Sequence, residues 1–171
     1  MGCEAVSMES TDELRMLAIR QSLGEVVGAN VLISSGLDAL ALGVDTQSLR
    51  ELAGLGHREE SEAQDLFRQV KDELALAATV PSDPFAARWE LVRWWCRQVV
   101  GGDLAPEVGA RLIWDLAWVE LDFPPALQPI VGEVSEWEDW TPDWGNEREH
   151  YQRRIVAEMD SLLARPWPPP T

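Results

Sequence analysis

Apolar residues recur at spacings of three and four along almost the whole chain, and this helical period constrains the fold more than any other feature. The pattern is clearest in residues 58–77, whose apolar stripe is Ala63, Leu66, Phe67, Val70 and Leu74. Strand signals are nearly absent, because the chain has one tyrosine, few threonines and no alternating run of β-branched residues. The sequence therefore predicts an all-α fold.

Turn and capping signals divide the chain into about eight predicted helices. They span residues 10–23, 26–42, 46–53, 58–77, 84–100, 106–119, 123–139 and 142–164. The first is predicted to begin at a capping box formed by Ser10 and Glu13. The eighth is predicted to begin at Thr141, an N-cap residue followed by Pro142. The proline-bracketed segment TVPSDPF (79–85) is the clearest break in the chain.

The stretches on either side of this break resemble each other. IRQSLGEVVGANVLI (19–33) aligns with CRQVVGGDLAPEVGARLI (96–113), and LRELAGL (49–55) aligns with LQPIVGE (127–133). We expect an internal duplication of a four-helix unit, with copies at 11–78 and 84–164 sharing one core, and the alternative is chance likeness of amphipathic helices. Gly28 and Gly109 match in this alignment, and we expect both to be points of close helix packing. Residues 1–10 are expected to be flexible, and Trp167 in the proline-rich tail 165–171 is expected to pack back on the body.

The formal charge of −16 argues against nucleic acid and anionic membrane as partners, since both need a basic face. It favours a basic protein partner. No apolar run is long enough to cross a bilayer, and the N-terminal MGCEAVS fits neither a secretory signal nor, because of Val6, a myristoylation signal. We therefore expect a cytoplasmic protein. Arginine supplies 13 of the 14 basic residues, which suggests a GC-rich bacterial genome.

The sequence contains no pattern that specifies a reaction. Glu147 and His150 form a single Glu-x-x-His motif, whereas carboxylate-bridged metal sites in helical bundles use two such motifs, so no metal or other cofactor is predicted. Cys96 lies among large apolar residues, which predicts a buried and unreactive thiol. No nucleophile motif of the G-x-S-x-G type occurs. These observations favour a protein that is not an enzyme.

The segment SEWEDWTPDW (135–144) gives the strongest local indication of function. Three of its acidic residues lie at the C-terminal end of the predicted seventh helix, where the helix dipole disfavours negative charge. Trp137 continues an apolar stripe and is expected in the core, whereas Trp140 and Trp144 flank the turn that follows. The predicted partner-binding residues are Glu136, Glu138, Asp139, Trp140, Asp143 and Trp144.

Aromatic anchors with an acidic rim are typical of surfaces that bind basic proteins. We therefore expect a non-enzymatic, acidic protein-binding module, of the inhibitor or immunity type, that occludes a basic site on its partner. One alternative is a small helical enzyme or ligand carrier with a tryptophan-lined pocket between the two units, since the chain has nine tryptophans. Another is a structural subunit with an obligate partner.

Overall fold

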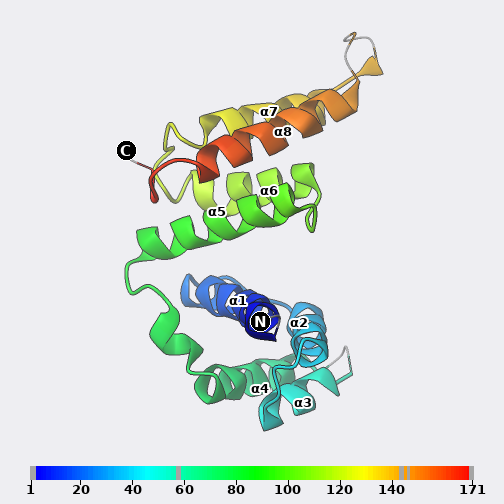
Figure 1. Cartoon of the computed structure of the whole chain (residues 1–171), viewed down its shortest axis with the longest axis vertical. Coiled ribbons are helices and arrows are strands. Elements are labelled where there is room, and N and C mark those ends of the chain that lie inside the picture. The colour runs from blue at the N-terminus through cyan, green and yellow to red at the C-terminus, as the bar shows by residue number, and fades with distance from the viewer. Residues whose placement is uncertain (1–2, 57–58, 143–144, 146, 170–171) are drawn as a thin grey trace. The chain divides into compact units, whose positions relative to one another are not determined.

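The structure, a computed structural model, describes residues 3–56, 59–142, 145 and 147–169, with side chains from residue 11 onward. Over these residues the chain is all-α, with eight α-helices and no strand, as the sequence predicts (Figure 1). The chain divides into two compact units, Met1–Ser82 and Asp83–Thr171. Of the helices that the structure describes, none is long and apolar enough to cross a membrane.

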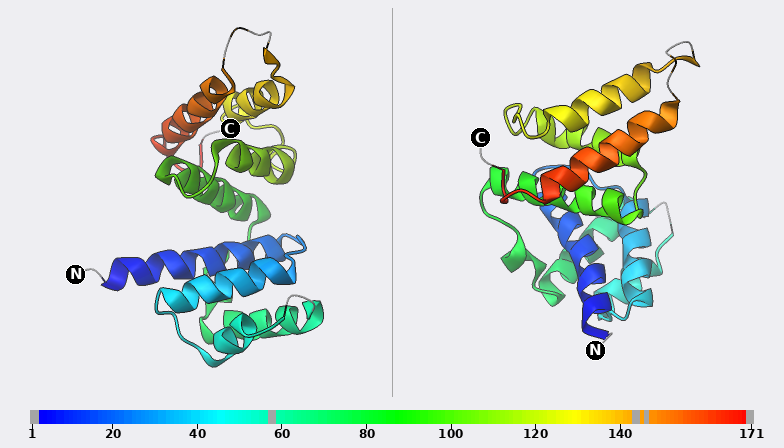
Figure 2. Two further views of the ribbon diagram at one scale, coloured as in Figure 1. Left: turned by 90° about the vertical axis from the view of Figure 1, so that its right-hand side faces the viewer. Right: turned by 45° about the horizontal axis from the view of Figure 1, so that its top comes forward.

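The first unit contains α1 (Cys3–Ser22), α2 (Ala29–Ala41), α3 (Gln47–Ala53), α4 (Glu60–Glu73) and a 3₁₀ helix, η1 (Leu76–Thr79). Helix α2 packs against α1, α3 and α4, and η1 packs against α1 and α4 (Figure 2). The core of this unit is formed by the apolar stripes that the helical period predicts. Its fully buried members include Leu14, Leu32, Leu49, Leu52, Ala63, Phe67 and Val70.

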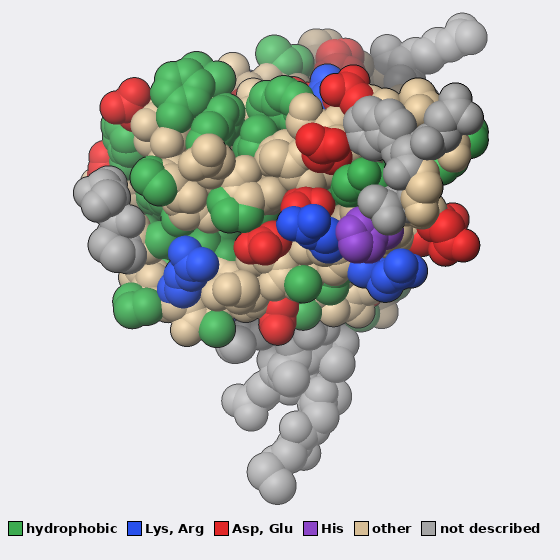
Figure 3. Space-filling model, turned by 90° about the horizontal axis from the view of Figure 1, so that it is seen from above, with side chains coloured by type: hydrophobic (Ala, Val, Ile, Leu, Met, Phe, Trp, Pro, Cys, Tyr) green, Lys and Arg blue, Asp and Glu red, His purple; other side chains and the backbone are tan. Residues whose placement is uncertain are grey.

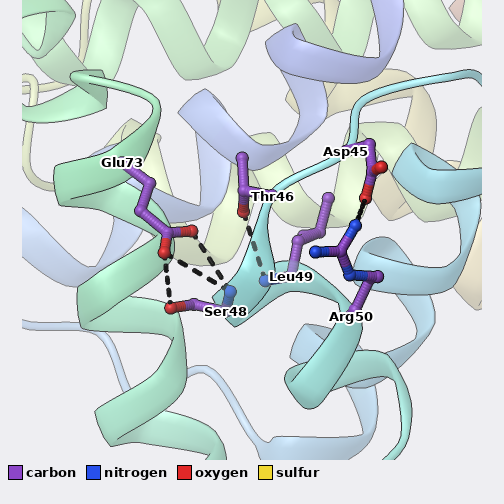
Figure 4. A network of polar contacts seen from close by, with 6 residues as sticks. All are labelled: Asp45, Thr46, Ser48, Leu49, Arg50 and Glu73. Atoms are coloured by element: carbon purple, nitrogen blue, oxygen red, sulfur yellow. Dashed lines mark hydrogen bonds and ion pairs between the residues drawn. The ribbon is translucent and has the colours of Figure 1, made fainter.

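Two carboxylates of α4 hold the starts of neighbouring helices. Glu60 accepts a hydrogen bond from the backbone N–H of Ala29, the first residue of α2, at 2.9 Å. At the other end of α4, Glu73 accepts bonds from the backbone N–H of Ser48 at 3.2 Å and from its hydroxyl at 2.9 Å (Figure 4). The first backbone N–H groups of a helix lack partners within the helix, and a carboxylate there also interacts favourably with the helix dipole. Helix α4 thereby fixes the positions of α2 and α3.

The second unit contains α5 (Pro84–Gly101), α6 (Pro106–Ile113), a π-helix, η2 (Trp114–Trp118), α7 (Gln128–Asp139) and α8 (Arg148–Leu163). Helix α8 packs against α5, α6 and α7, and α7 runs beside it (Figure 1). Asp83 caps α5 through the backbone N–H of Ala86 at 3.0 Å. The buried side chains of this unit include Trp95, Cys96, Val99, Ala110, Ile113, Ile130, Val134, Ile155 and Met159.

Four helix pairs form in both units, whereas the packing of α5 against α8 has no comparable counterpart between α1 and α4. The contacts of α1 with α2, α2 with α3, α3 with α4 and α2 with α4 correspond to those of α5 with α6, α6 with α7, α7 with α8 and α6 with α8. The packing is therefore consistent with an internal duplication, which stays a prediction. The units differ in that α7 has 12 residues and α3 has 7.

Several predicted helix boundaries are wrong. Helix α1 begins at Cys3, so Ser10 is not its N-cap, and Glu13 accepts a hydrogen bond from the Ser35 hydroxyl at 2.7 Å instead. Helix α8 begins at Arg148 and not at the predicted cap, Thr141. The local capping signal set neither boundary, and at α1 the predicted capping partner Glu13 makes a tertiary contact instead.

The two matched glycines have different roles. A Cβ atom on Gly109 would lie 2.3 Å from Cγ2 of Val99, so the backbone of α6 comes close to α5 there, as predicted. Gly28 is instead the N-cap of α2, and a Cβ atom built on it would meet no atom within 4 Å. The prediction of close packing at Gly28 is therefore wrong.

Trp167 in the proline-rich tail packs back on the second unit, as predicted. The ring of Trp167 lies edge-on to Trp89, with 5.6 Å between the ring centroids. The guanidinium of Arg93 lies 5.5 Å from the Trp167 ring centroid on its face. The tail residue is thus held between two side chains of α5.

Candidate binding surface on the second unit

The π-helix η2 places aromatic side chains at the surface of the second unit. A π-helix carries an extra residue per turn, is rare, and occurs often at functional sites. Here it directly follows α6 and leaves Trp114 and Trp118 half-buried. Asp122 and Phe123 then adopt left-handed backbone conformations, with φ of 59° and 54°. Residues other than glycine are strained in this region by about 1–2 kcal/mol.

This strained turn presents an apolar side chain to solvent. The Phe123 side chain is 53% exposed, and its ring lies edge-on to Trp118 at a centroid distance of 5.6 Å. Val119 is also exposed, and the acidic residues Glu120 and Asp122 lie between Val119 and Phe123 in the chain. Backbone strain concentrates at functional sites, where the rest of the fold maintains it.

Arg111 connects η2 with the end of α7. Its Nε donates to Asp115 at 2.9 Å, and its Nη1 donates to Glu138. The same guanidinium lies over the Trp114 ring, 5.3 Å from the centroid. The hydrogen bonds that Arg111 donates, first to Asp115 and then to Glu138, raise the pKa of Arg111, so the group remains charged. One arginine thus satisfies two carboxylates while it covers one face of a tryptophan.

A second arginine covers a second tryptophan on this surface. The guanidinium of Arg148, the first residue of α8, lies 3.7 Å from the ring centroid of Trp137. Its Nε also donates to the Trp137 carbonyl at 3.3 Å. Trp137 is half-buried and not fully in the core as predicted, because α8 begins at Arg148 and its first side chain covers the ring.

The predicted partner-binding residues fall into three groups. Glu136 and Asp139 are exposed and form no ion pair within the described part of the chain. Glu138 is paired with Arg111, and Trp140 is half-buried at the C-cap of α7. The predicted residues Asp143 and Trp144 lie outside the described residues.

The unfavourable helix-dipole position of the acids has a partial structural explanation. Arg111 neutralises Glu138, and Arg148 donates to a carbonyl in the last turn of α7. Both groups place positive charge where the helix dipole is negative. Of these acidic residues, only Glu136 and Asp139 therefore lie at the negative end of the α7 dipole without an ion pair among the described residues.

Glu133 was missed by the sequence reasoning. Glu133 is only 8% exposed, and its carboxylate pairs with Arg154 at 2.6 Å. Burial raises the pKa of Glu133, and the nearby Arg154 opposes this shift. The helical period could have indicated that Glu133 is buried, because position 133 lies three residues after Ile130 and so on the same buried face of the helix. The Arg111–Asp115 ion pair could also have been predicted from the sequence, since the two residues have the i, i+4 spacing that brings side chains together on a helix.

Charge on this face is mixed. Viewed from the side of α7 and α8, acidic, basic and apolar side chains are interspersed on the surface (Figure 3). The acidic excess is also spread over the chain, because residues 1–82 and 83–171 each contain eight more acidic than basic residues. Net charge therefore does not select this surface, and its distinguishing feature is the pairing of tryptophan with arginine and carboxylate.

The described residues contain no constellation that points to catalysis. No group of three His, Cys, Asp or Glu side chains is placed to hold a metal ion within them. His150 packs edge-on against Tyr151 at a ring distance of 5.5 Å. The Cys96 thiol is buried, as predicted, and burial raises its pKa to about 12; its low reactivity stays a prediction. Three hollows found on the described residues have no tryptophan in their linings.

Comparison with known proteins adds no relative. No protein-family model matches the chain, and no curated protein or solved structure is significantly similar to it.

Proposed function

We propose that the chain is a non-enzymatic, acidic protein-binding module, and that the surface formed by η2, the end of α7 and the start of α8 binds an arginine-rich face of a basic partner. The module would act as an inhibitor or immunity-type protein in a bacterial cytoplasm. The observation that carries the proposal is that Trp114 and Trp137 on this surface each hold a guanidinium on one ring face.

The chemistry of these contacts is that of arginine recognition. A guanidinium binds an aromatic face through its charge and its planar shape, and it binds a carboxylate through parallel hydrogen bonds. Arg111 lies over the Trp114 ring and at the same time donates one hydrogen bond each to Asp115 and Glu138. A partner's arginine would find the same combination of groups beside the exposed carboxylates of Glu136 and Asp139, which have no ion pair among the described residues.

The overall charge supports the proposal through association kinetics. A formal charge of −16 attracts a basic protein over a distance set by the Debye length, which is about 8 Å at physiological salt. Such steering raises association rates and weakens as salt is added. The tryptophans would then supply contact area, as aromatic residues do at the centres of interfaces.

The direct test uses two labelled peptides of equal length and charge, one rich in arginine and one rich in lysine, with binding read by fluorescence anisotropy. We expect tighter binding of the arginine peptide, weakened by salt. A fourfold variant of the surface should lose about tenfold or more in affinity, or ~1.4 kcal/mol. It combines Glu136→Gln, Glu138→Gln, Asp139→Asn and Trp140→Ala.

A charge-matched control separates the surface from the general charge. It combines three exposed carboxylates of the first unit, as Asp38→Asn, Glu51→Gln and Glu62→Gln. The control should bind as the unmodified protein does. Equal affinity of the fourfold variant and the control for the arginine peptide would refute the proposed surface. Capture of a basic protein from a bacterial lysate by the unmodified chain and not by the fourfold variant would then identify the partner.

A further inference from the structure

A hollow of about 340 Å³ lies within the first unit, between the end of α1, the C-terminal half of α4 and η1. Its lining comprises Ala18, Gln21, Ser22, Arg68, Lys71, Asp72, Ala77 and Val80. An adjoining hollow of about 530 Å³ shares Gln21, Arg68 and Lys71 with it. Hollows of this size are typical of small-molecule sites. The shared residues are basic or amide groups, in a chain of strongly acidic composition.

Lys71 is the only lysine of the chain and lines both hollows. Its Nζ donates to Oε1 of Gln21 at 2.8 Å and lies 5.7 Å from the ring centroid of Phe67. No carboxylate of the described residues forms an ion pair with it. An ammonium group has three donors, so Lys71 retains hydrogen-bonding capacity for a ligand.

The local electrostatics favour an anion beside Lys71. Burial lowers the pKa of Lys71, the positive charge of Arg68 lowers it further, and the attraction of Asp72 opposes both effects. Two cations therefore lie close enough to repel each other while one of them is partly desolvated. A bound anion would relieve the repulsion and compensate for the lost hydration.

The partner of Lys71 is held in place by a chain of hydrogen bonds. Nε2 of Gln21 donates to Oε1 of Gln64 at 2.8 Å, and Nε2 of Gln64 donates to the Val27 carbonyl at 2.6 Å. The same Gln64 amide donates to Glu60, the carboxylate that holds the start of α2. Because its amide N–H is used in this chain, Gln21 keeps its carbonyl oxygen directed at the ammonium. Lys71 is therefore positioned before any ligand arrives.

Arg68 is available to the same ligand. It forms an ion pair with Asp65 at 2.9 Å, and the two side chains are 65% and 62% exposed. Exposed pairs of this kind contribute at most about 1 kcal/mol, so the guanidinium exchanges partners at little cost. Ala18, Ala77 and Val80 supply the apolar part of the lining of the hollow.

We propose that this hollow binds a small organic carboxylate, with its carboxylate group between the Lys71 ammonium and the Arg68 guanidinium and its short aliphatic chain against Ala18, Ala77 and Val80. The apolar side of the lining favours a ligand with a hydrocarbon part. The Asp72 carboxylate at the same hollow disfavours a doubly charged anion such as phosphate. This site is separate from the surface proposed for protein binding and does not depend on it.

The single lysine gives a direct experiment. Labelling with lysine that carries ¹³C at Cε yields one lysine signal in the NMR spectrum of the full chain. Sodium butyrate, sodium phosphate and sodium chloride are compared at equal ionic strength. We expect butyrate to shift the Lys71 signal saturably, to raise the pKa read from it, and to raise the unfolding temperature followed by far-UV circular dichroism. Phosphate and chloride should leave all three unchanged.

Two variants test the proposed contacts. Arg68→Gln keeps the labelled lysine and changes an exposed residue, so we expect a folded protein with butyrate affinity reduced about tenfold. Arg50→Gln removes a guanidinium of the first unit outside the hollow and should bind butyrate normally. An unshifted Lys71 signal at high butyrate, full affinity in Arg68→Gln, or a phosphate response equal to that of butyrate would each overturn the proposal.

Discussion

Gly109→Ala tests the close approach of α6 to α5. The added methyl carbon would lie 2.3 Å from Cγ2 of Val99, 3.3 Å from Cδ2 of Leu104 and 3.7 Å from Cε of Met159. The first distance is far below van der Waals contact, so atoms must move. Valine is branched at Cβ and has restricted χ1 rotamers, which leaves it little freedom to withdraw.

Two opposing effects set the size of the change. Alanine favours a helix interior over glycine by about 1 kcal/mol, which stabilises the variant. Overpacking of a core destabilises by roughly 1–3 kcal/mol. The expected result is a lower free energy of unfolding of the second unit, by roughly 0–2 kcal/mol. Without the clash the same substitution would be stabilising.

Gly132→Ala is the matched control because it isolates the helix effect. Gly132 lies within α7, and a Cβ atom there would meet nothing within 4 Å. This variant should therefore gain about 1 kcal/mol. All nine tryptophans lie in residues 83–171, so denaturant unfolding followed by tryptophan fluorescence reports on the unit that contains both glycines.

The difference between the two variants, roughly 1–3 kcal/mol, measures the clash itself. Val99→Ala removes the nearest atom, so Gly109→Ala should be less destabilising in that background, which a double-mutant cycle measures. If Gly109→Ala is as stabilising as Gly132→Ala, or if Val99→Ala leaves its effect unchanged, the close approach of α6 and α5 is wrong.

Three further predictions concern single residues. Hydrogen bonds from the side chain of Thr46 first, and then from Ser48, lower the pKa of Glu73 from its ordinary 4.5. The ionised Glu73 carboxylate therefore stabilises the fold above pH 4.5, and this stabilisation is lost as the pH falls through the lower pKa of the folded state. Glu73→Gln should reduce the loss of helicity in acid, which circular dichroism measures. In a Cys3→Ser variant the remaining thiol, Cys96, should resist alkylation at pH 8 until denaturant is added, and rapid labelling of the native protein would contradict its burial. Ala75→Gly should stabilise the first unit by roughly 0.5–1 kcal/mol in thermal unfolding, since relief of the left-handed backbone at φ 52° exceeds the added chain entropy, and a loss of stability would show that this residue is unstrained.

The predictable part of the candidate surface follows from local spacing. The period of three and four placed Ile130 and Val134 in the core, and it left Glu136 and Asp139 exposed as expected. The pairing of Glu138 with Arg111 was not predictable, because 27 residues separate them and a different helix supplies each. The contacts of Arg111 with Glu138 and of Arg148 with Trp137 therefore depend on how α6, α7 and α8 pack, whereas those of Arg111 with Trp114 and Asp115 are local.

Local signals also failed where tertiary contacts compete with them. Ser10 and Thr141 are good N-cap residues in isolation, but α1 extends upstream of the first and α8 starts beyond the second. At the start of α2 the acceptor is Glu60 of α4, which is 31 residues away and invisible to a local capping rule. Capping energies of about 1 kcal/mol are small beside the burial of a helix face, so packing decides such boundaries.

By itself, the sequence determined that the chain is helical, where its main break falls and which stripes are buried, because the side-chain period of a helix is a local property that 3.6 residues per turn imposes. Only the tertiary structure decided that Arg148 covers Trp137, which carboxylate caps which helix and where Lys71 lies without an ion pair among the described residues. These contacts join residues far apart in the chain, and their energies depend on distance and burial, which are properties of the packed helices.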